Sequence, residues 1–351
     1  LTLIYLVPLP SSIWQSFPGR GDIVAIDQIV GLENSTRPVT LVPNAGWLSS
    51  FTLFTPLAVL LFGVQLKRDD LYRLLPLFIG LGAVSGLIGL LQIAGTPGGP
   101  LYFYRITNSD SAVGLFANRN HAATLLACIF PMLAVFASTG AGRHEVSQSR
   151  LLIAAAIALV LIPLILVTGS RAGLVLSVIG LSGALLLYRQ PVRKQDFGSK
   201  NQKWKWLTLP KLTLAAVLCL GLLTIYFSRA EAVDRLFSQS MDADSRSMFW
   251  AESLNLFDKY FLLGSGAGSF GSAYQIIEKD HMLTSFYLNR AHNDWVELVV
   301  TFGIFSILIA GVAAIQFLRG MIRLWISPDK KRRSVIFGRM AGIIIAMIGI
   351  A

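Results

Sequence analysis

Long, uninterrupted apolar runs restrict the fold of this sequence more than any other feature. A helix that crosses a membrane needs roughly 20 consecutive apolar residues, with about 17 as the lower limit. Several runs reach that length, and the chain is 54% hydrophobic but only 14% charged. The runs cover residues 50–66, 71–94, 115–138, 151–167, 172–188, 207–227 and 296–318. The sequence therefore predicts an all-α fold, a polytopic bundle of transmembrane helices.

Two further apolar runs reach the ends of the chain. Residues 1–14 begin without a methionine, and residues 335–351 stop while the sequence is still apolar. We therefore expect a longer protein that is truncated at both ends, with further spans missing. The predicted division is transmembrane helices with short loops over 1–227, a long polar loop over 228–294, and transmembrane helices again over 295–351.

The net charge of +11 is typical of a nucleic-acid-binding protein, but it also occurs in membrane proteins whose basic loops set their orientation. The positions of the basic residues decide between these two interpretations. Lys and Arg gather in alternate connections between the spans, above all in residues 189–206. Because positively charged loops stay in the cytoplasm, the other connections, including 228–294, are predicted to face away from it. Within that loop, residues 244–257 place apolar side chains on one helical stripe, which predicts a short helix at the membrane interface. No nucleic-acid partner is expected.

Three arginines of the non-cytoplasmic side occupy the expected starts of helices. They are Arg119 in FANRNHA, Arg171 in TGSRAG and Arg246 in DADSRSMFW. A helix N-terminus carries about half a positive charge, so a cation there is unfavourable by roughly 0.3 to 1 kcal/mol unless an anion binds with it. Backbone N–H groups and a guanidinium together suit a phosphate group. The alternative is that each arginine reaches lipid headgroups or pairs with a nearby acidic residue.

His292, in RAHNDW, lies just outside the last long span. Asp294 and Glu297 have the spacing of a capping box, so a helix is expected to begin at Asp294. A histidine held between arginines would have a lowered pKa, because a second positive charge is disfavoured there. The neutral imidazole that results is what a general base requires. In the alternative interpretation, His292 only hydrogen-bonds the loop at the interface.

Metal and nucleotide sites have weak support in the sequence. The spacings HxxxH and HExxH and closely paired cysteines are absent. Asp242 and Asp244 resemble a short metal-binding DxD pattern, but capping of the following helix explains them equally well. The run GSGAGSFG, with Gly264, Gly266 and Gly268, either forms a phosphate nest or simply turns the chain. We therefore expect no metal and no cofactor.

Four segments, taken together and in this order, resemble the O-antigen ligase superfamily, which also contains O-antigen and exopolysaccharide polymerases. They are GLFANRNHAATLL, LVTGSRAGLVLSVIGL, SRSMFWAESLNLF followed by LLGSGAGSF, and AHNDWVELVVTFGIF, within about residues 100–318. The resemblance implies a multi-pass helical protein of the bacterial cell inner membrane. It also implies a long periplasmic loop that contains the short interfacial helices, with the active site facing the periplasm.

The resemblance further implies an enzyme that takes a glycan from undecaprenyl diphosphate, without a metal or a nucleotide sugar. The acceptor hydroxyl belongs to the lipid A core for a ligase, or to another glycan repeat for a polymerase. Arg171 and Arg246 match the essential arginines that hold the diphosphate, and His292 matches the essential histidine. Proton transfer from the acceptor to His292 would make the enzyme an inverting glycosyltransferase. Substrate-binding roles fall to neighbouring residues: Asn118, Arg119, Asn120 and Asn293.

A transporter or flippase for an anionic lipid-linked saccharide is the alternative from another class. Such a protein is expected to carry charges near the midplane of the bilayer and often has repeated halves. Here the candidate residues gather at one surface instead. A structural membrane protein would tolerate replacement of these residues. Ligase and polymerase share the motifs, so the sequence leaves the acceptor open.

Overall fold

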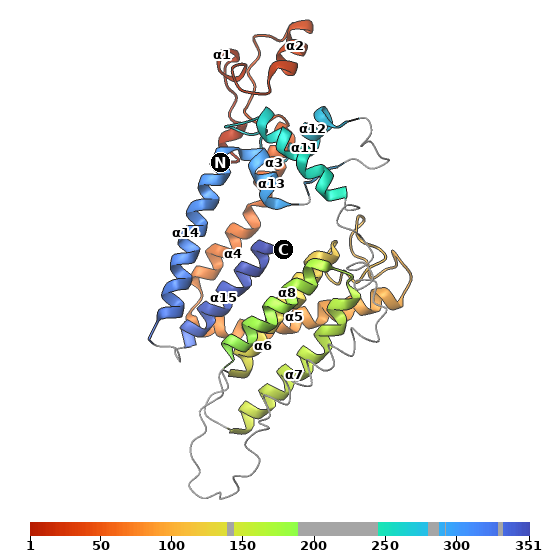
Figure 1. Ribbon diagram of the computed structural model, residues 1–351, viewed down its shortest axis with the longest axis vertical. Coiled ribbons are helices and arrows are strands. Elements are labelled where there is room, and N and C mark those ends of the chain that lie inside the picture. Colours follow the sequence, from red (N-terminus) through yellow and green to blue (C-terminus); the bar gives the residue numbers. More distant parts are fainter. Residues whose placement is uncertain (139–143, 189–244, 280–287, 292, 329–332) are drawn as a thin grey trace, which may run out of the picture. The chain divides into compact units, whose positions relative to one another are not determined.

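The computed structural model describes most of the chain, and Figure 1 shows its course. The described residues are 1–138, 144–188, 245–279, 288–291, 293–328 and 333–351. Their regular elements are helices, apart from an isolated bridge between Leu9 and Arg37. Outside the described residues lie the predicted span at 207–227, the basic connection at 189–206, Asp242, Asp244 and His292.

The chain divides into two compact units. Unit 1 consists of Leu1–Leu66 and Ser240–Leu318, and unit 2 of Lys67–Gln239 and Arg319–Ala351. The described helices of unit 1 are η1 (Ile4–Leu6), α1 (Ser11–Trp14), α2 (Gly21–Ile29), α3 (Pro43–Thr52), α4 (Phe54–Gln65), α11 (Ser245–Lys259), α12 (Phe270–Ile277) and α13 (Asp294–Phe302). Those of unit 2 are α5 (Arg68–Ala94), α6 (Arg119–Ser138), α7 (His144–Val167), α8 (Arg171–Leu187) and α15 (Arg333–Ile350). Helix α14 (Ile304–Ile326) crosses the division.

Six described helical stretches are long and apolar enough to cross a membrane. They are Pro43–Gln65, Arg68–Ala94, Arg119–Ser138, Gln148–Val167, Ile304–Ile326 and Arg333–Ile350. Helix α8 is also apolar but has only 17 residues. The predicted all-α fold with several transmembrane helices is thus confirmed.

Residues 1–14 do not form the transmembrane helix that their apolar sequence predicts. They fold into η1 and the single turn α1. Pro8 and Pro10 interrupt the run, because proline has no N–H to donate and its ring clashes with the preceding helical turn. The hydroxyl of Tyr5 donates to the carbonyl of Leu263 at 2.5 Å, so this aromatic side chain packs within unit 1.

The last long apolar run is broken in the structure. Gly303 separates α13 from α14, so residues 296–318 are shared between two helices and the candidate span is Ile304–Ile326. Gly303 has a φ of 55°, and a Cβ there would lie 2.3 Å from the carbonyl oxygen of Leu262. Only glycine tolerates both conditions. The predicted boundary was wrong because an apolar run does not reveal a break that depends on a distant backbone contact.

Helix α6 is the central helix of unit 2. It packs against α5, α7, α8 and α15, and most of its side chains are buried. Small residues let α8 approach closely. A Cβ at Gly173 would lie 2.3 Å from the Cβ of Ala123, and one at Gly180 would lie 2.6 Å from the carbonyl oxygen of Ala127. Close packing of this kind drives helix association where lipid removes the hydrophobic effect between helices.

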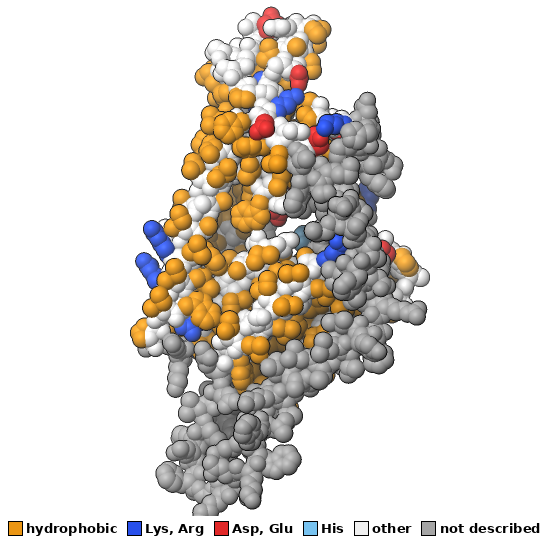
Figure 2. All heavy atoms as spheres, in the orientation of Figure 1, with side chains coloured by type: hydrophobic (Ala, Val, Ile, Leu, Met, Phe, Trp, Pro, Cys, Tyr) orange, Lys and Arg blue, Asp and Glu red, His pale blue; other side chains and the backbone are white. Residues whose placement is uncertain are grey.

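Hydrophobic side chains cover the outer faces of the candidate spans. Figure 2 shows them along α14, whose Leu308, Val312 and Leu318 are 58%, 61% and 57% exposed. A large apolar surface of this kind is unfavourable in water but matches the hydrocarbon chains of lipid. The surface is therefore that of a multi-pass membrane protein.

Candidate functional site

Arg119 and Arg171 are the first residues of α6 and α8, as the sequence predicts. Helix α7 ends at Val167, so residues 168–170 alone connect it to α8. Ser170 is the N-cap of α8, and its Oγ accepts a hydrogen bond from the N–H of Gly173 at 3.0 Å. This bond satisfies one of the backbone donors that a helix start leaves without a partner.

A hydrogen bond between two side chains joins the starts of α6 and α8. Ser170 Oγ donates to Asn120 Oδ1 at 2.8 Å, in addition to its capping bond. Ser170 is 1% exposed, so leaving either bond unmade would be costly. This bond holds the start of α8, with Arg171, beside the start of α6, with Arg119. Asn120, a predicted substrate-binding residue, therefore also has a structural role.

Polar groups of the preceding loop hold Arg119. Its backbone N–H donates to Asn108 Oδ1 at 3.1 Å, and its Nη1 donates to Ser111 Oγ at 3.3 Å. Asn118 Oδ1 accepts from the N–H of Asn120 at 2.8 Å. Asn118, another predicted substrate-binding residue, therefore also shapes the start of α6.

Gln92 on α5 positions that loop, and sequence reasoning missed it. Its side chain is buried and donates to the carbonyls of Leu101 and Gly114 at 2.8 and 3.0 Å. It also accepts from the N–H groups of Val113 and Gly114 at 3.0 and 2.8 Å. A buried amide is costly unless its hydrogen bonds are made. A glutamine inside the apolar run 71–94 is the signal that could have indicated this role.

Arg246 is the second residue of α11, so its predicted place at a helix start is confirmed. Helix α11 belongs to unit 1, where it contacts α12 and α13. Leu256 of this helix and Tyr260, directly after it, are buried in the core of unit 1, whereas Leu254 is 60% exposed. Helix α11 therefore has apolar side chains on an exposed side as well as a buried one, and its position at a membrane interface stays a prediction.

Buried Glu252 on α11 has two polar partners that are themselves exposed. Its Oε1 lies 2.7 Å from Lys279 Nζ, and its Oε2 accepts from Asn255 Nδ2 at 2.9 Å. Burial, together with the negative charges of Glu278 and Glu252, raises the pKa of Tyr274 to about 12. The phenol therefore stays protonated at neutral pH. The ion pair joins α11 to Lys279, which follows α12.

Helix α13 begins at Asp294 as predicted, but a different residue caps it. Asn293 Oδ1 accepts from the N–H groups of the two residues after Asp294, at 3.0 and 3.2 Å. Glu297 Oε2 reaches back and accepts from the N–H of Ala291 at 3.2 Å. The cap is Asn293 because its backbone is extended, with φ −148° and ψ 108°, as a capping residue requires. Asn293, a predicted substrate-binding residue, thus has a structural role.

The glycine run of the long loop turns the chain and uses its donors internally. Gly264, Gly266 and Gly268 have φ values of 79°, 94° and 72°, which favour glycine. The N–H of Gly264 donates to the carbonyl of Tyr260, and that of Gly266 to the carbonyl of Thr301, both at 2.8 Å. A phosphate nest requires N–H groups that point at a ligand. Of the two interpretations of this run, the structure supports the turn.

The candidate residues are divided between the two units. Unit 2 brings together the starts of α6 and α8, with Arg119 and Arg171. Unit 1 contains Arg246 and Asn293, at the starts of α11 and α13. Across the described ranges, no group of three or more His, Cys, Asp or Glu side chains could hold a metal ion. Convergence of the arginines with His292 stays a prediction.

These features define the class of the molecule, a multi-pass helical membrane protein in which Arg119, Arg171 and Arg246 lie at helix starts. Residues 155–311 match the family model described as O-antigen ligase. Members of the family are enzymes that transfer glycans. The matched range includes Arg171, Arg246 and His292 but begins after Arg119. The comparison with curated proteins gave no match, and the comparison with solved structures gave none either.

Proposed function

We propose that the protein transfers a glycan from undecaprenyl diphosphate to an acceptor hydroxyl at the periplasmic face of a bacterial inner membrane. The acceptor that we favour is the lipid A core, the substrate of an O-antigen ligase. The match to the O-antigen ligase family over residues 155–311 carries this proposal. Two observations support it: Arg171 and Arg246 both lie in the matched range, and each lies in the first turn of a helix.

The proposed donor follows from chemistry outside the cytoplasm. Sugar nucleotides and ATP are not supplied there, so an activated glycan has to arrive attached to a lipid. Its diphosphate gains negative charge as the bond to the anomeric carbon breaks. In the proposed reaction, Arg171 and Arg246 bind the diphosphate through their planar guanidinium groups and stabilise that charge in the transition state.

The proposed acceptor step uses His292 as a general base. The acceptor oxygen attacks the anomeric carbon from the side opposite the diphosphate, and the acceptor proton passes to the neutral imidazole. One glycosidic bond forms while the bond to the diphosphate breaks, so the anomeric configuration inverts. The polar residues around the starts of α6 and α13 assist substrate binding: Asn118, Arg119, Asn120 and Asn293.

Reconstitution of the purified full-length protein with an undecaprenyl diphosphate glycan and lipid A core tests the proposal. We expect transfer by the parent and a loss of about a hundredfold or more in His292→Ala and in Arg246→Ala. Arg105→Ala is the matched control, because Arg105 is exposed and precedes the matched range. Unchanged transfer by the His292 and Arg246 variants would contradict the assigned roles.

The choice of acceptor separates the related functions. An O-antigen or exopolysaccharide polymerase would instead extend a second glycan repeat that is offered in place of the core. Movement of the glycolipid across sealed vesicles without a new glycosidic bond identifies a transporter or flippase instead. Mass spectrometry of the products distinguishes all three results.

A further inference from the structure

A pocket lies in unit 2 at the end opposite the starts of α6 and α8. It encloses about 500 Å³, within the range of roughly 300–1,000 Å³ that ligand sites occupy. Its lining comes from the first turns of α5 and α15, the last turn of α6, and α7. On α6, Phe136 in this lining and Arg119 at the helix start are separated by about 25 Å at 1.5 Å per residue. The pocket is therefore distinct from the site described above.

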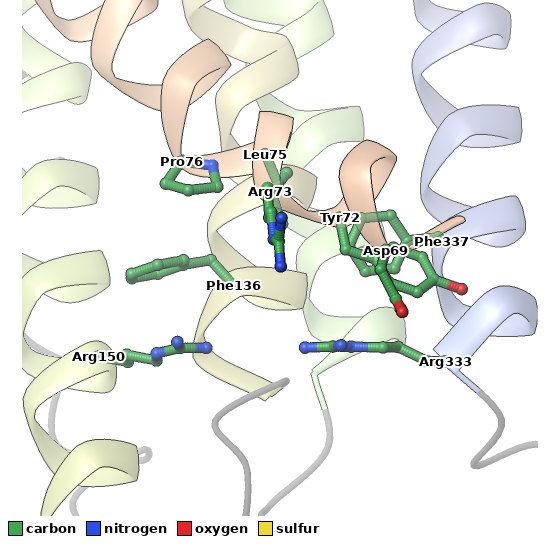
Figure 3. Close-up of a pocket in the computed structure, with 9 residues that line it drawn as sticks. All are labelled: Asp69, Tyr72, Arg73, Leu75, Pro76, Phe136, Arg150, Arg333 and Phe337. Carbon is green, nitrogen blue, oxygen red and sulfur yellow. The ribbon is translucent and has the colours of Figure 1, made fainter. Parts of the chain in front are cut away.

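Three arginines from different helices converge on this pocket. Figure 3 shows Arg150 and Arg333 pointing toward one another from opposite sides, with Arg73 between them. Like charges repel, so their convergence is favourable only with an anion close by. Among the described side chains, Arg73 forms an ion pair with Asp70 at 3.4 Å, which is weak because Arg73 is 82% exposed. The lining itself contains a single carboxylate, that of Asp69.

Aromatic rings orient two of these guanidinium groups. Arg150 Cζ lies 5.2 Å from the ring centroid of Phe136, and Arg333 Cζ lies 4.8 Å from that of Tyr72. The ring of Tyr72 packs in turn on Phe337, with 4.4 Å between centroids. A guanidinium over a ring face keeps its N–H edge available for a bidentate contact with phosphate. The pocket therefore presents oriented donors for an anion.

The surroundings of the pocket add positive potential on one side and apolar surface on the other. Helices α5 and α15 begin here, and each N-terminus contributes a partial positive charge. Further along α5, the side chains of Leu77, Phe78 and Leu81 are 54%, 51% and 48% exposed. A ligand that combines a phosphate with hydrocarbon chains would match both surfaces.

We propose that this pocket binds the phosphate of an anionic membrane phospholipid, whose acyl chains lie along α5. Basic pockets between transmembrane helices on the cytoplasmic side are suited to such headgroups. The distribution of Lys and Arg in the sequence predicts that this end of unit 2 is cytoplasmic. Free phosphate shares the headgroup chemistry but makes no contact with the apolar face of α5. The proposal does not depend on glycan transfer.

Native mass spectrometry of the delipidated full-length protein tests this site. Phosphatidylglycerol, phosphatidylcholine and inorganic phosphate are titrated separately, and the bound species are counted. We expect phosphatidylglycerol to bind about tenfold more tightly than phosphatidylcholine, and the double variant Arg150→Gln, Arg333→Gln to bind it about tenfold more weakly than the parent. Phe136→Leu keeps all charges but loses the ring, so a smaller loss is expected.

Arg319→Gln is the control for the loss of a positive charge away from the pocket, since Arg319 is exposed on α14 and does not line the pocket. Its phosphatidylglycerol binding should equal that of the parent. Equal binding of the two phospholipids would overturn the proposal, and so would equal losses in Arg319→Gln and the double variant. Displacement of phosphatidylglycerol by equimolar inorganic phosphate would show a phosphate site without lipid specificity. If the double variant does not fold, the comparison of lipids on the parent and Phe136→Leu decides.

Discussion

The two ends of unit 2 both present arginines, but they hold them by different means. At the start of α8, Arg171 follows a capped turn in which buried Ser170 donates to Asn120 at 2.8 Å. At the opposite end, Arg150 and Arg333 lie over aromatic rings, at 5.2 and 4.8 Å from the ring centroids. Directed hydrogen bonds fix the first end, whereas stacking orients the second.

This difference indicates different tasks for the two ends. Hydrogen bonds weaken steeply with angle, so the network around the starts of α6 and α8 holds the backbone of Arg119 and Arg171 within narrow limits. Reactions at a phosphate-bearing centre require such placement. A guanidinium that stacks on an aromatic ring can slide over the ring face, which accommodates a lipid headgroup whose acyl chains move. We therefore expect glycan transfer to depend on the first end and lipid binding on the second.

The largest expected effect on glycan transfer comes from removing the arginine at the start of α8. Arg171→Ala should reduce glycan transfer by about a hundredfold or more, because one group that stabilises the leaving diphosphate is lost. Arg150→Ala makes the same chemical change at the opposite end and should leave transfer within about twofold of the parent. Initial rates in bilayers of constant lipid composition provide the measurement. Equal losses in the two variants would show that the ends do not have separate tasks.

Overpacking between α6 and α8 should have the next largest effect. In Gly173→Ala the new Cβ would lie 2.3 Å from that of Ala123, so the helix starts must move apart, at a cost of about 1 to 3 kcal/mol. Gly80→Ala is the control, since no heavy atom lies within 4 Å of a Cβ there. It should be neutral or stabilising by up to about 1 kcal/mol. Thermal unfolding in detergent measures both, and a Gly173→Ala protein as stable as the parent would refute this packing.

Loss of the cap of α8 should have the smallest effect. Ser170→Ala removes the bonds to Gly173 and Asn120 and should lower the free energy of unfolding by about 1 kcal/mol. Ser177→Ala is the comparison on the same helix, where the hydroxyl donates only to the carbonyl of Gly173 at 2.6 Å. Such a back-bond contributes little to stability. Denaturation curves in mixed micelles should separate the two variants; identical curves would contradict the role of the cap.

Local signals explain what the sequence could predict. The helix starts at Arg119, Arg171 and Asp294 follow from short polar segments before apolar runs, and the structure confirms them. The predicted N-cap of α13, Asp294, was wrong by one residue. Asn293 and Asp294 are both good capping residues, and the extended backbone of Asn293 makes it the cap.

Contacts between distant segments explain what the sequence could not predict. The break at Gly303 depends on the approach of the Leu262 backbone, and the role of Gln92 depends on the loop that folds over it. Arg150 and Arg333 belong to different helices, and in sequence they indicate only which face is cytoplasmic. Their convergence in one pocket requires the tertiary structure.

The amount of free undecaprenyl diphosphate released per glycan transferred tests the central claim most directly. The purified protein is incubated with an undecaprenyl diphosphate glycan and acceptor, and both products are quantified from the same reaction. The account predicts one undecaprenyl diphosphate for each new glycosidic bond, and about a hundredfold less of both products from the Arg171→Ala and His292→Ala variants. Release of undecaprenyl monophosphate, or relocation of the intact glycolipid without a new bond, would contradict it.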